Sequence, residues 1–359
     1  KLFPDLSDVA REPTRRALAQ SLGEAFWLMR QQKERGRATE LIFAFAGHGD
    51  VNDAGEGYVV LADGPFARSD FTTQVLAASP ADINHVIIDA CSSYFMVRAR
   101  GNESGRVELT PKLLDVLSDK DDAALRARTG VLVSTSSAAE VHESSELGAG
   151  VFSFLLRSAL AGGADSDGDG RIEYAEAAGF VAAASAGLDD PRARLRVYAD
   201  APLQRPHSAL ADLAHSGADR FLAVDESGPV HLRILDAHGM PYAEVHRTGK
   251  QPLVLALMGN AYFVVQQGAR EAVLVPRAAG TYALSTLTFE DSPQARGDAG
   301  AALAGLYQTA FGPEFLEGFL ATSSGELAPP RAGLAFTPEY AKAGAPHARL
   351  PVGIIGLST

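Results

Sequence analysis

The sequence Leu41-Ile-Phe-Ala-Phe-Ala-Gly-His48-Gly49-Asp50 places a histidine directly after a short run of apolar residues. A second stretch, His85-Val-Ile-Ile-Asp89-Ala90-Cys91-Ser92-Ser93, places the single cysteine of the chain directly after another such run. Runs that are apolar on both faces are typical of buried parallel strands. The carboxyl ends of parallel strands meet at one edge of a sheet, where sites are commonly built. We therefore expect His48 and Cys91 to face each other across a cleft.

The patterns around these two runs indicate an α/β fold. Helical spacing of apolar residues predicts a helix over 12–31, and short apolar runs predict further strands at Val59–Ala62 and Thr129–Ser134. Such strands, separated by helical segments, are typical of a mostly parallel sheet flanked by helices. The further helices are expected at 70–78, 111–118, 149–161 and 174–186.

The pattern changes near residue 217. Short apolar runs about ten residues apart, divided by Gly, Pro and Asp, predict a β-rich accessory domain over 217–290. We expect the first domain to span 1–205. Residues 291–359 are expected to form a helical segment followed by an irregular tail.

Composition and charge exclude several classes of protein. The 359 residues carry a net charge of −12, and an acidic surface repels the phosphates of nucleic acids. A single cysteine excludes a disulfide framework and multi-cysteine metal sites. Every apolar run is far shorter than the roughly 18 residues of a membrane span. We expect no nucleic-acid partner and no membrane span, while a cytoplasmic and a cell-envelope location are both compatible with the sequence.

A cysteine beside a histidine forms a nucleophile and its base. The imidazole of His48 would take the proton of the Cys91 thiol, and the thiolate would attack a carbonyl carbon. The amides of Gly49 and Cys91 are candidates for binding the resulting oxyanion. Taken singly, a cysteine is more often an inert core residue. The positions of both residues after buried strands favour catalysis.

Residues 41–50 and 85–93 resemble the caspase-type cysteine peptidases, in particular a bacterial branch beside the metacaspases and paracaspases. The two site residues are 43 positions apart, which fits the roughly 50 of the caspase signature loosely. The resemblance covers about 10–205, and Ser92-Ser93 departs from the family pattern. It implies a caspase-like fold and a cysteine endopeptidase that hydrolyses peptide bonds.

The resemblance also implies a specificity. Relatives that cut after Arg or Lys bind that side chain, called P1, with acids, one of which lies two residues before the cysteine. That position is Asp89 here, and Glu140, with Glu143 next, matches the stretch that supplies a second acid. Carboxylates pair with guanidinium and ammonium groups, so a peptide or protein substrate with Arg or Lys at P1 is expected. Asp89 could instead cap nearby amides at the end of its strand.

Two expectations concern the chain itself. Seven Arg or Lys residues between 98 and 128 mark a long connection between strands, which such an enzyme would cleave in itself. Family members also carry a strand ahead of the helix at 12–31, and no such strand is found in 1–11. We expect that strand on a preceding N-terminal fragment that stays bound as a partner.

Residues 165–176 match the calcium loop of an EF-hand. Acids at the first, third and fifth positions converge on one cation, the sixth glycine allows the turn, and the twelfth acid closes the site. Helical patterns flank the loop on both sides, although an Asp- and Gly-rich turn that binds weakly would share the pattern. We expect Ca²⁺ as a cofactor, with ligands from Asp165, Asp167, Asp169, the Arg171 carbonyl and Glu176.

Other functions fit the sequence less well. A cysteine phosphatase needs an arginine six positions after its cysteine, and Arg98 is one position too far. A serine hydrolase needs a G-x-S-x-G turn, which the sequence lacks. The main alternative is a catalytically silent caspase-like scaffold that binds partners through its β-rich domain.

Overall fold

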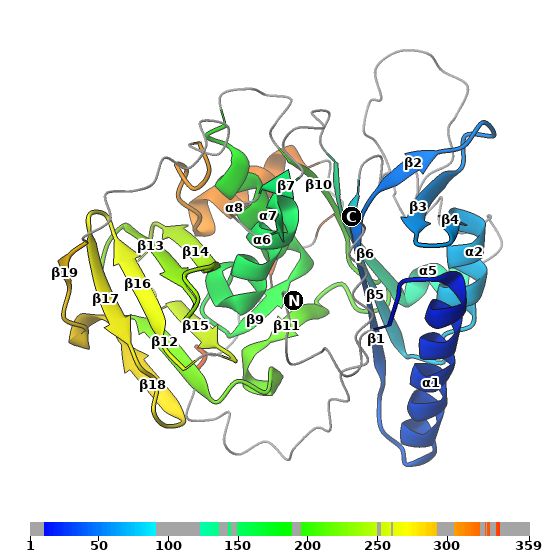
Figure 1. Cartoon of the computed structure of the whole chain (residues 1–359), viewed down its shortest axis with the longest axis horizontal. Helices are drawn as coiled ribbons and strands as arrows, with labels where there is room; N and C mark the ends of the chain where they lie inside the picture. Colours follow the sequence, from blue (N-terminus) through cyan, green and yellow to red (C-terminus); the bar gives the residue numbers. More distant parts are fainter. Residues whose placement is uncertain are drawn as a thin grey trace. The chain divides into compact units, whose positions relative to one another are not determined.

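The computed structural model describes residues 11–90, 123–135, 143–144, 149–188, 195–249, 253–259, 261–292, 305–323, 327, 329–330 and 335–337. These residues fall into two compact units. The first contains the described residues up to Thr135 together with 196–208, and the second contains the others (Figure 1). The boundaries expected at 205, 217 and 290 stay predictions.

A four-stranded sheet forms the centre of the first unit, in the order β1-β5-β6-β10. Strands β1 (Glu40–Gly47), β5 (Ile83–Ala90) and β6 (Thr129–Thr135) run parallel, as predicted, and every residue of β5 is buried. Strand β10 (Arg196–Asp200), which was not predicted, is antiparallel to β6 at the edge. The result is a mixed sheet of the expected α/β class.

Helix α1 (Arg15–Glu34) covers one face of this sheet. It begins at Thr14, whose hydroxyl accepts a hydrogen bond from the Ala17 N–H at 3.1 Å. Its apolar residues at helical spacing enter a core shared with Val86 and Ile88 of β5. The remaining elements of the unit are β2 (Gly49–Val51), β3 (Gly57–Leu61), β4 (Gly64–Ala67), α2 (Arg68–Phe71), the π-helical turn η2 (Thr72–Ala77) and α5 (Ala123–Ala127).

Two helices of the second unit flank loop 165–176 in the sequence, and a third helix packs on the second of them. Helix α6 (Val151–Ser158) continues into the π-helical turn η4 (Ala159–Gly163) before the loop, and α7 (Tyr174–Ser185) follows it. Helix α8 (Pro313–Thr322) packs so closely on α7 that a Cβ added at Gly179 would lie 2.8 Å from the Leu316 side chain. Strands β7 (Glu143–Ser144) and β8 (Ala149–Gly150) pair ahead of α6.

The predicted β-rich part forms two further sheets, ordered β15-β12-β18 and β14-β13-β16-β17-β19. The short apolar runs of this part, at 221–224, 230–235, 253–257, 262–266, 272–275 and 281–287, correspond to six of these strands, while β14 and β19 were not predicted. The strands are β12 (Arg220–Val224), β13 (Val230–Leu235), β14 (Pro241–Arg247), β15 (Leu253–Leu257), β16 (Phe263–Gln267), β17 (Arg270–Leu274), β18 (Gly280–Ala283) and β19 (Glu290–Asp291). Two 3₁₀ turns lie beside them, η5 (Leu213–His215) and η6 (Leu284–Thr286).

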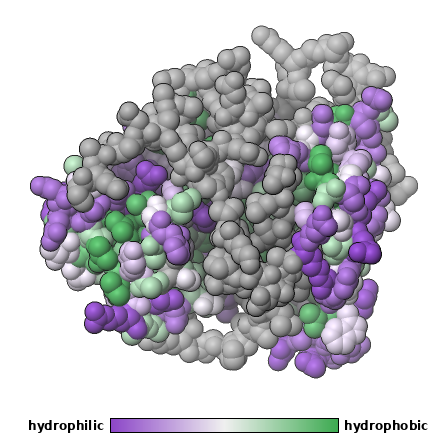
Figure 2. Space-filling view, viewed as in Figure 1, coloured by the Kyte–Doolittle hydropathy of each residue, from purple (hydrophilic) through white to green (hydrophobic). Residues whose placement is uncertain are grey.

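Helices and strands of the second unit share one core. The Glu244 N–H of β14 donates to the Ser158 hydroxyl of α6 at 3.0 Å. Tyr307 is buried between two helices, with ring centroids 6.3 Å from Phe154 and 6.1 Å from Phe180. Figure 2 shows apolar side chains gathered on the visible face of the β-rich strands, between hydrophilic ones. In the described part of the chain, no helix has the length and apolar character needed to cross a membrane.

Candidate active site

The register between β1 and β5 brings the ends of both strands to one edge of the sheet. The parallel ladder pairs Gly47 with Ala90, the last residue of each strand. His48 is the next residue after Gly47, and Cys91 is the next after Ala90. Neighbouring strands lie about 4.8 Å apart. His48 is exposed at this edge, and Cys91 lies outside the described residues.

The amide of Gly49 points away from the strand beside it. Gly49 pairs with Val59 of β3, and the Val60 N–H donates to the His48 carbonyl at 2.9 Å. This bond joins the residues next to Gly49 and Val59, so Gly49 and Val59 form a non-hydrogen-bonded pair of the antiparallel ladder. In such a pair, the N–H groups of both residues point away from the partner strand. Val51, two residues on, likewise turns its N–H outward, where the Asp50 carboxylate accepts it at 2.8 Å. The Gly49 N–H is therefore directed away from β3, and its use as an oxyanion donor stays a prediction.

Asp89 is a buried acid one residue before the end of β5. Its side chain is on the face opposite the core of α1, because its neighbours Ile88 and Ala90 alternate with it and Ile88 and Ala90 belong to that core. The residue is 9% exposed and lies level with Ser134 of β6. The Ser134 hydroxyl donates to an Asp89 carboxylate oxygen at 3.4 Å. Ser134 could not be found from the sequence, because only the register of β6 places it beside Asp89.

The two other predicted pocket acids are less well defined. Glu140 lies outside the described residues. Glu143 belongs to β7 of the second unit, and its backbone pairs with Gly150 of β8. The use of these two residues as pocket acids stays a prediction.

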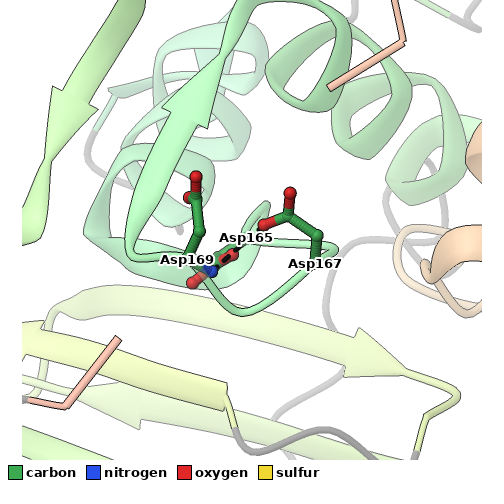
Figure 3. Close-up of side chains that lie close together, drawn as sticks. All are labelled: Asp165, Asp167 and Asp169. Carbon is green, nitrogen blue, oxygen red and sulfur yellow. Dashed lines mark hydrogen bonds between the residues drawn. The ribbon is translucent and has the colours of Figure 1, made fainter. Parts of the chain in front are cut away.

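The three aspartates of loop 165–176 converge, as Figure 3 shows. One carboxylate oxygen from each of Asp165, Asp167 and Asp169 lies within 4.8 Å of the others. The loop backbone holds them: the Gly168 and Gly170 amides donate to Asp165 at 2.7 and 2.9 Å. The Asp169 and Arg171 amides donate to Asp167 and Asp169 in turn, at 3.1 and 2.8 Å.

Glu176 stands apart from this trio in the described residues. Its carboxylate accepts bonds from the Ser166 amide and hydroxyl at 2.9 and 2.8 Å, and from the Glu173 amide at 2.9 Å. With Glu173 it forms a capping box at the start of α7. Its carboxylate is thus occupied by the first turn of the helix, and the sequence argument missed its partner Ser166.

Burial makes the negative charge of this loop costly. It raises the pKa of Asp165 to about 7, and repulsion from the other two aspartates adds to the effect. Burial likewise raises the pKa of Asp169 to about 6 and that of Glu176 to about 8. A hard divalent cation takes carboxylate oxygens as ligands and would offset the repulsion. The donor set therefore fits such an ion.

One comparison with known proteins gave a match. A family model described as the caspase domain matches residues 6–183. The matched range includes β1, β5 and β6 with His48 and Cys91, and it ends inside α7. Searches of curated proteins and of solved structures found no match. Residues 6–183 of the chain are therefore caspase-like.

Proposed function

We propose that the chain is a cysteine endopeptidase that cleaves after Arg or Lys with Cys91 as nucleophile and His48 as acid and base. The pairing of Gly47 with Ala90 inside a caspase domain carries this proposal, because both residues follow that pair directly. The exposed position of His48 supports it further, since an incoming peptide has access to the imidazole.

The reaction passes through a thioester. His48 takes the proton of the Cys91 thiol, and the thiolate adds to the carbonyl carbon of the scissile bond. The amides of Gly49 and Cys91 donate to the oxyanion. His48 returns the proton to the nitrogen of the leaving amine as the C–N bond breaks. Water, deprotonated by His48, then hydrolyses the thioester and regenerates the thiol.

Asp89 supplies negative charge to the P1 pocket in this proposal. A buried carboxylate beside the catalytic edge favours a cationic side chain over an acidic one. The Ser134 hydroxyl, which donates to it at 3.4 Å, helps to position this carboxylate. Glu140 or Glu143 would provide the second acid.

The test compares fluorogenic peptides that differ only at P1, with Arg, Lys or Asp. Hydrolysis after Arg and Lys that disappears in Cys91→Ala is the expected result. Cleavage only after Asp would contradict the acidic pocket while keeping the dyad. A folded wild-type protein that cleaves none of the three would favour the scaffold instead.

We also propose that loop 165–176 binds Ca²⁺. The convergence of three carboxylates and the raised pKa values of Asp165 and Asp169 support this, since a cation would offset the repulsion of buried acids. Calcium would recruit the Arg171 carbonyl and draw Glu176 from its capping bonds. Isothermal calorimetry with CaCl₂ tests it, and the absence of heat above that of a chelated control would refute it.

Autoprocessing between residues 98 and 128 is a further part of the proposal. A basic P1 specificity makes the seven Arg and Lys residues of this connection candidate cleavage sites. Intact-mass spectrometry of wild type and Cys91→Ala after incubation tests it. Fragments from the wild type alone are expected, and identical intact masses would contradict it.

The partner proposed for β1 is an N-terminal fragment of the same protein. The strand is apolar from Leu41 to Ala46, which is typical of an interior strand. Among the described strands it pairs with β5, and Ile42 is 59% exposed. Mass spectrometry of the protein purified from its source under non-denaturing conditions would detect a bound fragment.

A further inference from the structure

Loop 165–176 contacts parts of the chain far from it in sequence. Its strand β9 (Arg171–Glu173) pairs with β11 (Ala209–Asp212), which leads into the β-rich sheets. The Leu213 N–H, directly after β11, donates to the Gly170 carbonyl at 2.8 Å. In the described residues the edge of the loop strand is therefore paired with this chain's own β11.

A second contact comes from near the end of the chain, from residues 335–337, here called the Phe336 segment. The Phe336 N–H donates to the Gly168 carbonyl at 2.5 Å. The aromatic side chain lies over Gly170, where an added Cβ would be 2.6 Å from the Phe336 Cβ. Glycine is required at position 170 for two reasons. Its φ of +76° favours glycine, and the absence of a side chain leaves room for the phenyl ring.

The phenyl ring also joins the loop to the β-rich sheets. It stands edge-on to the ring of Phe221 in β12, with centroids 5.9 Å apart. It packs against a buried cluster made of Leu213, Phe221, Val254 and Ala256. Phe336 therefore holds one side of the loop against β12 and β15.

The peptides that contact the Phe336 segment also position the first acid of the loop. Gly168 accepts the Phe336 bond through its carbonyl and donates to Asp165 through its amide. Gly170, beneath the ring, donates to the other oxygen of the same carboxylate. A change in the Asp165 carboxylate and a change in the docking of Phe336 therefore act on the same two peptides.

We propose that docking of the Phe336 segment and binding of a divalent cation by loop 165–176 stabilise each other. This inference rests on the cation site proposed above. A cation would fix the Asp165 carboxylate and with it the Gly168 and Gly170 peptides that receive Phe336. In return, a docked Phe336 holds the loop in the form in which the three aspartates converge, so less order has to be created on binding. Thermodynamic linkage makes the two effects equal in size.

The first measurement is the calcium affinity of the full chain by isothermal calorimetry. Phe336→Ala is expected to raise Kd about fivefold or more, within the usual range of coupling between sites. Phe336→Leu, which keeps an apolar group over Gly170, is expected to have a smaller effect. Phe289→Ala is the matched control, because Phe289 is also half-buried but packs near Arg270, away from the loop. It is expected to leave Kd unchanged.

The second measurement needs no variant. Hydrogen exchange of the Phe336 amide is followed in wild type with CaCl₂ and with chelator, and the amide of Leu222 in β12 serves as reference. Calcium is expected to slow exchange at Phe336 and to leave Leu222 unchanged. If calcium binds but Kd is the same in Phe336→Ala, or exchange at Phe336 is indifferent to calcium, the coupling is wrong and the cation site stands. If calcium does not bind the wild type, both are wrong.

Discussion

Gly47 and Ala90 lie opposite each other as the last residues of two paired parallel strands. Each of them is followed directly in the sequence by a residue proposed for catalysis, His48 after Gly47 and Cys91 after Ala90. Gly47 has no side chain and Ala90 has only a methyl group, so neither fills this edge of the sheet. Both strands lie within residues 6–183, which the caspase domain model matches.

Replacing His48 with alanine should abolish most of the activity and leave the fold intact. The imidazole is exposed, so its removal opens no cavity in the core. Loss of a general acid and base lowers turnover by about 10²–10⁴-fold. The measurement is kcat/KM for a peptide with Arg at P1, together with the melting temperature. His238→Ala, an exposed histidine of the β-rich part, is the control, and equal activity of His48→Ala and wild type would contradict the assignment.

Replacing Asp89 with asparagine should weaken cleavage after Arg and Lys. Removing one partner of a desolvated charge pair costs about 2–5 kcal/mol, so kcat/KM should fall by at least about thirtyfold. Ser134→Ala should raise KM several-fold with little change in kcat, since Ser134 acts through its bond to Asp89 of the proposed pocket. The exposed Asp53, changed to asparagine, controls for net charge. An Asp89→Asn enzyme that still prefers Arg would show that other groups set the specificity.

Calcium should raise the melting temperature of the wild type. A ligand at about a hundred times its Kd stabilises the folded state by about 2.7 kcal/mol. Asp165→Asn should lose this gain, because it removes a charge that the loop backbone holds at the cation site. Glu290→Gln, an exposed acid in β19, should keep it. Differential scanning calorimetry with CaCl₂ and with chelator measures the gain, and its persistence in Asp165→Asn would place the cation elsewhere.

A pair of glycine variants should separate backbone strain from packing at the loop. Gly170 and Gly239 both have a φ of +76°, but only Gly170 has a neighbour, the Phe336 ring, where a Cβ would stand. Gly239→Ala should cost about 1–2 kcal/mol from its left-handed backbone alone. Gly170→Ala should cost clearly more in urea unfolding with chelator present. If both variants lose the same free energy of unfolding, the Phe336 ring moves aside without cost, and its close packing on Gly170 does not stabilise the loop.

The strands beneath the candidate active site could be predicted because most of their side chains are apolar on both faces. The runs at Leu41–Ala46 and His85–Asp89 coincide with β1 and β5 to within two residues. Strand β14 escaped prediction because it begins with proline and alternates polar residues such as Glu244 and His246 with small or buried ones. Its alternation of buried and half-buried residues is explained only by α6, which packs against one face of the strand.

Contacts between distant segments could not be predicted. The EF-hand pattern identified the converging aspartates, since their spacing within one loop fixes their approach. No local pattern indicated that Glu176 caps α7, that Ser134 donates to Asp89, or that Phe336 lies over Gly170. These contacts depend on registers and chain paths that local patterns do not encode.

The most direct test of the central claim is covalent capture of the nucleophile. The wild type is treated with a peptidyl acyloxymethyl ketone carrying Arg at P1, and the product is analysed by intact-mass and peptide mass spectrometry. The account predicts one label per chain, on Cys91, with much slower labelling of His48→Ala and little labelling by the matching reagent with Asp at P1. Absence of a label on the folded protein, or equal labelling by the Asp reagent, would contradict a Cys91–His48 peptidase with a basic P1 specificity.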